Sequence, residues 1–163
     1  RETSTWCTDV RPRWWPFTSV GPTEVHGITR RRLRTAPNLR EALEGLVQRI
    51  DGRVFVAHNA EFDLGYVQHH AARLGIPLPD VPVICTLSLS RHVNRETGLS
   101  HRLADVCARY GVALTNAHDA LADARATAAI VPHLLAASGI TSLESLLLAA
   151  APAPRRRPRQ ERS

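Results

Sequence analysis

Three short segments of the sequence carry side chains that could take part in chemistry. The first, HNAEFD at residues 58–63, follows a β-rich run at residues 53–57. The second, HDALADA at residues 118–124, begins an alanine-rich segment, and the third is VHGIT at residues 25–29. Each contains a histidine, and the first two also contain aspartates where helices are expected to begin. Acids and histidines in this arrangement favour metal-assisted hydrolysis.

The two central acids are Asp63 and Asp123. Asp63 lies in the first turn of a helix that directly follows a strand, and ligand sites of open α/β sheets lie at such strand ends. Asp123 lies one turn into another helix, whose alanines would allow a close approach to the sheet. Two carboxylates brought together repel each other unless a cation lies between them, and oxygen ligands favour Mg²⁺ or Mn²⁺. The alternative is that each acid only complements a helix dipole.

His118 is the candidate general base. It precedes Asp123 by five residues, which is about 140° around an ideal helix, so the two would not share a face. We therefore expect His118 in the loop or first turn, pointing into the same opening. A histidine beside metal-bound carboxylates is suited to taking a proton from water. The alternative is that His118 and Asp119 form an ordinary helix cap.

The elements that must position these residues can be read from periodicity and caps. Short strands are expected at residues 53–57 and 82–86. Helices are expected at residues 37–50 (capped by Asn38 and Glu41), 60–74 (ended by Gly75), 87–93, 100–110 (capped by Ser100), 119–137 (with a kink at Pro132) and from a capping box at Thr141 to residue 150. Alternating strands and helices predict an α/β layered domain. Because only two or three strands are recognisable, the sheet is expected to be incomplete.

Several residues have a simpler structural interpretation. The leucines of the last helix are expected to pack in the core, with docking of a partner subunit as the alternative: Leu143, Leu146, Leu147 and Leu148. The histidines outside the three segments are expected to be exposed or satisfied by neighbours: His69, His70, His92, His101 and His133. Cys85 and Cys107 lie in apolar surroundings and are expected in the core.

Composition excludes several classes of protein. No apolar run approaches the roughly 20 residues of a membrane span, and the first residues lack the apolar segment of a secretory signal, so we expect no membrane partner. The three cysteines form no CxxC pair, which argues against a zinc ribbon or a disulfide framework. Free cysteines fit a reducing compartment, and we expect a cytoplasmic location.

The net charge of +6 is concentrated at the two ends of the chain. Residues 1–22 contain all three tryptophans and three prolines without a regular period, and we expect an irregular or non-native segment there. Residues 23–151 form the expected folded domain, and residues 152–163 a basic disordered tail. Such a tail could hold a polyanion or could simply be solvated.

The three motifs, in this order, resemble the DEDDh 3′–5′ exonucleases, the proofreading-type enzymes related to the epsilon subunit of bacterial DNA polymerase III. The resemblance runs from about Thr23 to about Ala137 and includes CTLSLSR at 85–91 and LADVCARYGV at 103–112. It implies a ribonuclease H-like fold, a mixed sheet flanked by helices, with the N-terminal part of the sheet incomplete in this chain.

The resemblance also implies roles for the site residues. Asp63 and Asp123 match two metal-binding carboxylates of the family, and His118 matches its general base. Two Mg²⁺ or Mn²⁺ ions would serve in an intact family member. The reaction implied is hydrolysis of phosphodiester bonds at nucleic-acid 3′ ends. DNA is the expected substrate, and an RNA-directed relative of the same fold is an alternative that the motifs do not separate from it.

Substrate contacts follow from the same resemblance. His26 and Phe62 fall where the family contacts the terminal nucleotide, and His58 and Asn59 are expected to support the motif loop. The alternative for Phe62 is a core aromatic beneath the helix. The implied partners are single-stranded DNA or nucleic-acid 3′ ends and a DNA polymerase subunit.

This sequence differs from the family at the family's first motif, Asp-x-Glu-Thr. The only similar fragment begins at Glu2, which is either the motif glutamate and a metal ligand or a chance match. Only 24 residues separate Glu2 from His26, where the family has two further strands. We therefore hypothesise that residues 6–22 come from a frame-shifted reading.

The sequence contains no methionine and starts at Arg1, which we interpret as an N-terminal truncation or processing. With the first-motif acids missing, weak or no activity is expected. The alternative function is a non-catalytic module of the same fold that binds single strands or a polymerase, with the arginines of residues 155–162 gripping phosphates.

Overall fold

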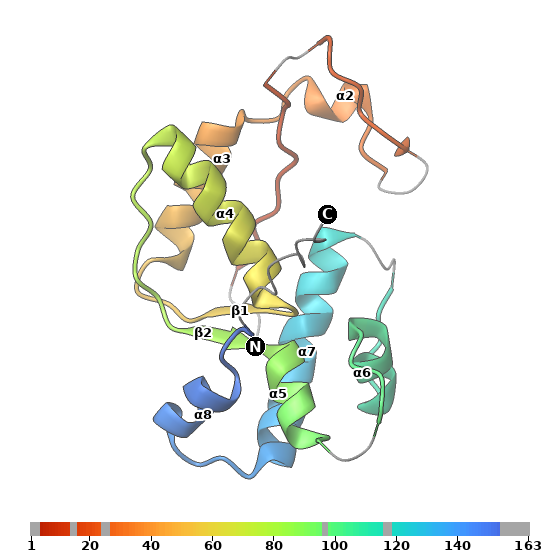
Figure 1. The fold of residues 1–163 in the computed structure, drawn as a ribbon. Helices are drawn as coiled ribbons and strands as arrows, with labels where there is room; N and C mark the ends of the chain where they lie inside the picture. The colour runs from red at the N-terminus through yellow and green to blue at the C-terminus, as the bar shows by residue number, and fades with distance from the viewer. Residues whose placement is uncertain (1–3, 14–15, 24–26, 96–97, 116–118, 154–163) are drawn as a thin grey trace, which may run out of the picture.

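The protein is described here by a computed structural model covering residues 4–13, 16–23, 27–95, 98–115 and 119–153. Its elements, in chain order, are α2 (Arg30–Leu33), α3 (Leu39–Ile50), β1 (Phe55–Ala57), α4 (Ala60–Leu74), β2 (Val83–Cys85), α5 (Thr86–Val93), α6 (Leu103–Arg109), α7 (Ala120–Ser138) and α8 (Leu143–Ala149) (Figure 1).

The described sheet consists of the two strands β1 and β2, which pair in parallel. Phe55 lies opposite Val83, and Ala57 lies opposite Cys85. A parallel pair requires a crossover, and α4 provides it. Both strands run directly into helices at the same edge, β1 into α4 and β2 into α5. This arrangement confirms the predicted α/β fold with an incomplete sheet.

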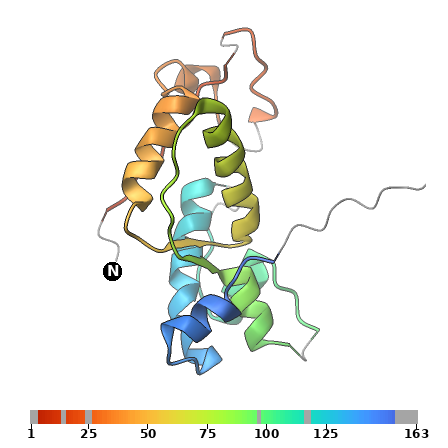
Figure 2. The same cartoon turned by 60° about the vertical axis from the view of Figure 1, so that its left-hand side comes forward.

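The helices lie on both sides of the strand pair. Figure 1 shows α3 and α4 side by side above β1 and β2, and α5 and α8 below them, while Figure 2 shows α7 passing behind the two strands. The smaller apolar cluster joins α3 to α4 and to the chain that follows α4, through Leu43, Ala71 and Ile76. The larger cluster lies on the other side, where α5, α6, α7 and β2 meet.

The larger core is organised around α7. Ile130 and Leu134 of this helix are fully buried, as are Leu89 of α5 and Val106 of α6. Cys85 and Cys107 are also buried, which confirms their predicted place in the core. Pro132 lies inside α7, as expected from the sequence, and its side of the helix is exposed.

Local sequence signals explain most helix ends. At the start of α3, the Asn38 side chain accepts a hydrogen bond from the Glu41 N–H (3.1 Å), and the Asn38 N–H donates to the Glu41 carboxylate (2.8 Å). This is the predicted capping box. α4 ends at Gly75, whose φ of 65° suits a residue without Cβ.

Two predicted caps are wrong. The helix expected from Ser100 begins at Leu103, because the Ser100 hydroxyl donates to the Asp105 carboxylate and Arg102 occupies the cap position. The last helix is capped by Ser142 rather than Thr141, since the Ser142 hydroxyl accepts the hydrogen bond from the Ser145 N–H (3.1 Å).

The leucines of α8 only partly fulfil the expectation of core packing. Leu146 and Leu147 pack against the larger cluster. Leu143 and Leu148 are exposed, at 62% and 75%. The end of α8 is tied to the sheet, because the Cys85 N–H donates to the Ala150 carbonyl at 2.8 Å.

Most of the described residues before α3 are irregular, and α2 is the labelled helix among them. Arg32 forms a two-pronged ion pair with Asp9 (2.8 and 2.9 Å), and Arg49 of α3 lies 4.5 Å from the ring of Trp6. An isolated bridge joins Arg11 to Asn38. These contacts attach the segment to α2 and α3. Its native or non-native origin stays a prediction.

No single helix in the described part of the chain has the length and hydropathy to cross a membrane. α7 and α8 pass that test only as a pair, across a bend of 109°.

Candidate active site

The turn from β1 into α4 is held by a buried polar network. The His58 ring lies between two partners, with Nδ1 3.0 Å from the Thr86 hydroxyl and Nε2 2.9 Å from the His101 carbonyl. The hydroxyl of Thr86 also lies 3.4 Å from the Ala57 carbonyl. Burial lowers the pKa of His58, which favours the neutral ring. The network thus fixes the end of β1 against the start of α5.

Asn59 is the residue that redirects the chain. Its φ of 70° and ψ of 49° place it in the left-handed region, and it is the only described residue other than glycine with a positive φ. Asparagine tolerates this conformation better than most side chains. Its side chain makes no cap hydrogen bond to α4. Its role at this turn is therefore conformational.

Asp63 lies in the first turn of α4 and is half-buried. Burial raises the pKa of its carboxyl group, while a hydrogen bond to its own backbone acts in the opposite direction. A raised pKa means that the surroundings disfavour the charged form, and a nearby cation would reverse this. In the described part of the chain, Asp63 makes no ion pair.

Asp123 continues the buried face of α7 toward the start of the helix. It is half-buried and precedes Ala126, Thr127, Ile130 and Leu134 at helical spacing, and those four are buried. Its charge reaches α6: the pKa of the Cys107 thiol is raised chiefly by burial and further by the Asp123 carboxylate. The acid therefore lies on the side of α7 that faces the core, with part of its surface accessible.

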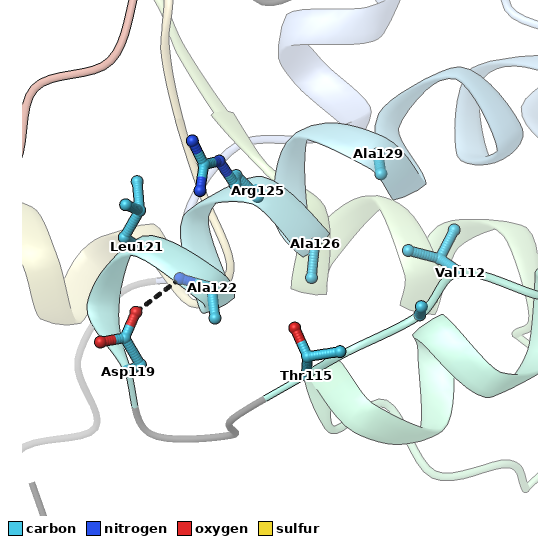
Figure 3. A pocket seen from close by; sticks show the side chains of 9 residues that line it. Val112, Thr115, Asp119, Leu121, Ala122, Arg125, Ala126 and Ala129 are labelled. Atoms are coloured by element: carbon cyan, nitrogen blue, oxygen red, sulfur yellow. Dashed lines mark hydrogen bonds between the residues drawn. The ribbon is translucent and has the colours of Figure 1, made fainter.

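Asp119 has a different task from Asp123. Its side chain accepts a hydrogen bond from the Ala122 N–H at 2.9 Å and caps α7, as Figure 3 shows. The capping interpretation is therefore confirmed for Asp119. His118, its neighbour, lies outside the described residues, as do Glu2 and His26.

A hollow of about 580 Å³ lies beside the start of α7 (Figure 3). Asp119, Ala122, Arg125 and Ala126 of α7 form one wall, and the segment from Val112 to Thr115 forms the other. Asp123 is not among its lining residues. Small side chains leave this space open, and Arg125 and Asp119 are the charged residues among those that line it.

The structure brings the helices of both predicted metal ligands to the same strand. α4 and α7 each contact β1, and each carries its aspartate in its first turn. Within the described ranges, no group of three or more His, Cys, Asp or Glu side chains could hold a metal ion. Two half-buried carboxylates without an ion-pair partner in those ranges suit a hard divalent cation, and further ligands would be needed.

Phe62 is 66% exposed, so the alternative of a core aromatic is wrong. Sequence reasoning also missed Thr86, which is fully buried and holds His58. Spacing offers no signal for this contact, because Thr86 is 28 residues from His58 and meets it only when the strands pair.

A sequence model of the RNase_T family, described as "Exonuclease", matches residues 19–131. The chain belongs to this exonuclease family. Over 103 residues, or 63% of the chain, it is 42% identical to "DNA polymerase III PolC-type" of Staphylococcus epidermidis and to the protein of the same name from Staphylococcus aureus. The matched part spans 7% of the length of each of these relatives. The resemblance to proofreading-type exonucleases is thereby confirmed.

A solved structure gives independent support for the fold. "Exonuclease X in complex with 5′ overhanging duplex DNA" superposes with a TM-score of 0.60, covering 87% of this chain and 78% of that one, at 24% identity. This likeness confirms the ribonuclease H-like architecture. Family membership makes the chain a nuclease domain.

Proposed function

We propose that this exonuclease domain shortens nucleic acids, DNA in particular, from their 3′ ends. The observation that supports this most directly is the placement of Asp63 and Asp123. They occupy the first turns of two helices that both contact β1, and both are half-buried without an ion-pair partner in the described residues. Such carboxylates are poised to bind cations rather than to stabilise the fold.

Asp63 and Asp123 would hold Mg²⁺ or Mn²⁺, and a metal pair supplies an activated water and stabilises the leaving oxygen of a phosphodiester. His118 would take the proton from the attacking water. Glu2 is proposed as a further metal ligand. The raised pKa of Asp63 would fall when a cation binds beside it, because the charged carboxylate is then favoured.

At the substrate side, Phe62 would stack on the terminal base and His26 would contact the same nucleotide. The exposed ring of Phe62 is available for this contact. Asn59 would set the direction of the turn that presents Phe62 and Asp63, through its left-handed conformation.

The staphylococcal relatives carry the name DNA polymerase III, and we propose a polymerase as partner and the cytoplasm as location. The exonuclease domain would comprise residues 23–151. An irregular segment (residues 1–22) would precede it, and a basic tail (residues 152–163) would follow it. Tested as residues 1–163 alone, the polypeptide is expected to cleave weakly, because Asp63, Asp123 and Glu2 lack the first-motif aspartate that the resemblance implies as a further ligand.

A non-catalytic module that binds single strands is the second candidate. It is favoured by the lack of a three-ligand metal group in the described part of the chain. Binding with a steep salt dependence and no cleavage would support this alternative.

The test is a cleavage assay with DNA and RNA oligonucleotides carrying a 5′ label, in Mn²⁺. We expect stepwise shortening of the DNA from its 3′ end, lost in Asp63→Asn and Asp123→Asn. Asp80→Asn is the matched control, because Asp80 is an exposed acid between α4 and β2. Shortening from the 5′ end, or equal cleavage by Asp63→Asn and wild type, would contradict the proposal.

A further inference from the structure

The exposed face of α4 carries a row of rings that packing does not explain. Phe62 and Tyr66 are 66% and 55% exposed. The Tyr66 and His70 rings lie 4.4 Å apart between centroids, and the His69 and His70 rings 5.0 Å apart. We call these four side chains the α4 ring row. An exposed helix face usually carries polar residues, so this row indicates a binding surface.

The row is opposite the packed side of α4. Ala60 and Ala71 are buried, and Val67 packs in the cluster shared with α3. Phe62, Tyr66 and His69 follow at intervals of four and three residues, which keeps them on one face. The rings are therefore not displaced core residues.

Three of the four rings touch one another. The Tyr66 and His70 centroids lie 4.4 Å apart and those of His69 and His70 5.0 Å apart, which is too close for a base to enter between them. A base would instead stack on the exposed outer side of the row, which requires that its own face is free. Aromatic platforms of this kind are how proteins bind single strands without reading their sequence.

The charges along α4 fit a nucleic-acid strand of defined direction. Asp63 lies beside Phe62 at the start of the helix, and Arg73 is exposed in its last turn, four residues after His69. A phosphate would be attracted to Arg73 at one end of the row. Because Asp63 at the other end is proposed to hold the cation that acts on the scissile phosphate, the cleaved end of a strand would lie at Phe62, and the nucleotides before it would lie toward Arg73.

We propose that the α4 ring row, together with Arg73, is a stacking platform for the unpaired nucleotides that precede the cleaved end. This rests on the proposed function for its direction, and it assigns a substrate role to Tyr66, His69, His70 and Arg73. Because the faces of bases are free for such stacking only where the bases are unpaired and unstacked, the domain would engage a single-stranded end and not a blunt duplex.

The test measures binding without cleavage. Fluorescence anisotropy with a labelled 12-nucleotide oligo-dT, in EDTA, reports affinity of the full chain independently of metal and turnover. Tyr66→Ala is expected to weaken binding about 5- to 150-fold, as for loss of one base–aromatic stack. Tyr66→Phe keeps the ring and is expected to bind as wild type. Phe17→Ala is the matched control, since Phe17 is 92% exposed but lies far from α4 in the sequence.

Two further measurements sharpen the result. Arg73→Gln is expected to lower the slope of log affinity against log salt by about one unit. A blunt duplex of the same length is expected to bind more weakly, and Tyr66→Ala is expected to leave the affinity for this duplex unchanged. Thermal melts of each variant check folding.

The proposal is overturned if Tyr66→Ala binds like wild type, if Phe17→Ala loses as much affinity, or if oligo-dT does not bind at all. A chain that cleaves normally while Tyr66→Ala binds like wild type would leave the proposed function standing without the platform. Binding that depends on Tyr66 in a chain that never cleaves would support the platform and contradict the proposed function.

Discussion

His58 and Thr86 join the end of β1 to the start of α5, with 3.0 Å between Nδ1 and Oγ1. The His101 carbonyl can only accept, so Nε2 of His58 carries a proton. When His58 is neutral, its Nδ1 must then accept from the Thr86 hydroxyl. When His58 is protonated, Nδ1 donates instead and the hydroxyl is free to donate to the Ala57 carbonyl. The hydrogen bond between Nδ1 of His58 and the Thr86 hydroxyl therefore reverses its donor and acceptor when His58 is protonated, while the atoms keep their positions.

Thr86→Val should destabilise the domain by about 1–3 kcal/mol, because it leaves the buried Nδ1 of His58 without a partner. Thr86→Ser keeps the hydroxyl and should cost less. Urea denaturation followed by circular dichroism measures both. Equal losses in the two variants would show that the methyl group of Thr86, rather than its hydrogen bond, stabilises this turn.

Stability should fall as the pH is lowered from 8 to 5. Burial lowers the folded-state pKa of His58, so the stability from the neutral ring is fully present above the unfolded pKa of about 6.5. It is lost as the pH falls through the folded pKa, at no more than about 1.4 kcal/mol per pH unit. His58→Asn should flatten the profile measured by denaturation at each pH.

His101 requires a separate control, since burial also lowers its pKa and its ring contacts the Ser90 hydroxyl at 2.9 Å. His101→Asn should remove only the part of the pH dependence of stability that comes from His101. A profile that stays unchanged in His58→Asn would exclude His58 as a source of the pH dependence.

Divalent metal should raise the melting temperature. A ligand at 100 times its Kd stabilises the folded state by about 2.7 kcal/mol. Melting in EDTA, Mg²⁺ and Mn²⁺ measures the shift, and both Asp63→Asn and Asp123→Asn should reduce it, whereas Asp80→Asn should not. An equal shift in all variants would place metal binding elsewhere.

The core of α7 should be sensitive to truncation. Ile130 and Leu134 have no exposed surface, and replacing either with alanine should cost about 2–5 kcal/mol. Leu148→Ala removes the same kind of side chain from a position that is 75% exposed and should stay within about 0.5 kcal/mol. Chemical denaturation compares them. A comparable loss in Leu148→Ala would indicate that α8 is covered by another surface.

Local signals predicted the elements well because they depend on neighbours in the sequence. Asn38 with Glu41 and the glycine at position 75 each determine a helix end through their own backbone geometry. The caps at Ser100 and Thr141 were misplaced because each has a competing neighbour: Asp105 takes the Ser100 hydroxyl, and Ser142 provides the cap that Thr141 could have made.

The site was less predictable because it depends on packing between distant segments. Asp63 and Asp123 could be identified as helix-initial acids, but their partial burial depends on how α4 and α7 meet the strands. The exposure of Phe62 and Tyr66 could not be read from the sequence either, since aromatic residues at helical spacing usually face the core.

The position of Asp123 on the buried face of α7 has a consequence for how this domain tolerates length changes. One residue inserted or deleted between Asp123 and Ala126 would turn the carboxylate by about 100° relative to Ile130 and Leu134. Ile130 and Leu134 would keep their places in the core, and the Asp123 carboxylate would rotate away from the buried face of α7. Homologous domains should therefore vary in length before Asp119 or after Ser138, and should preserve the spacing within this helix.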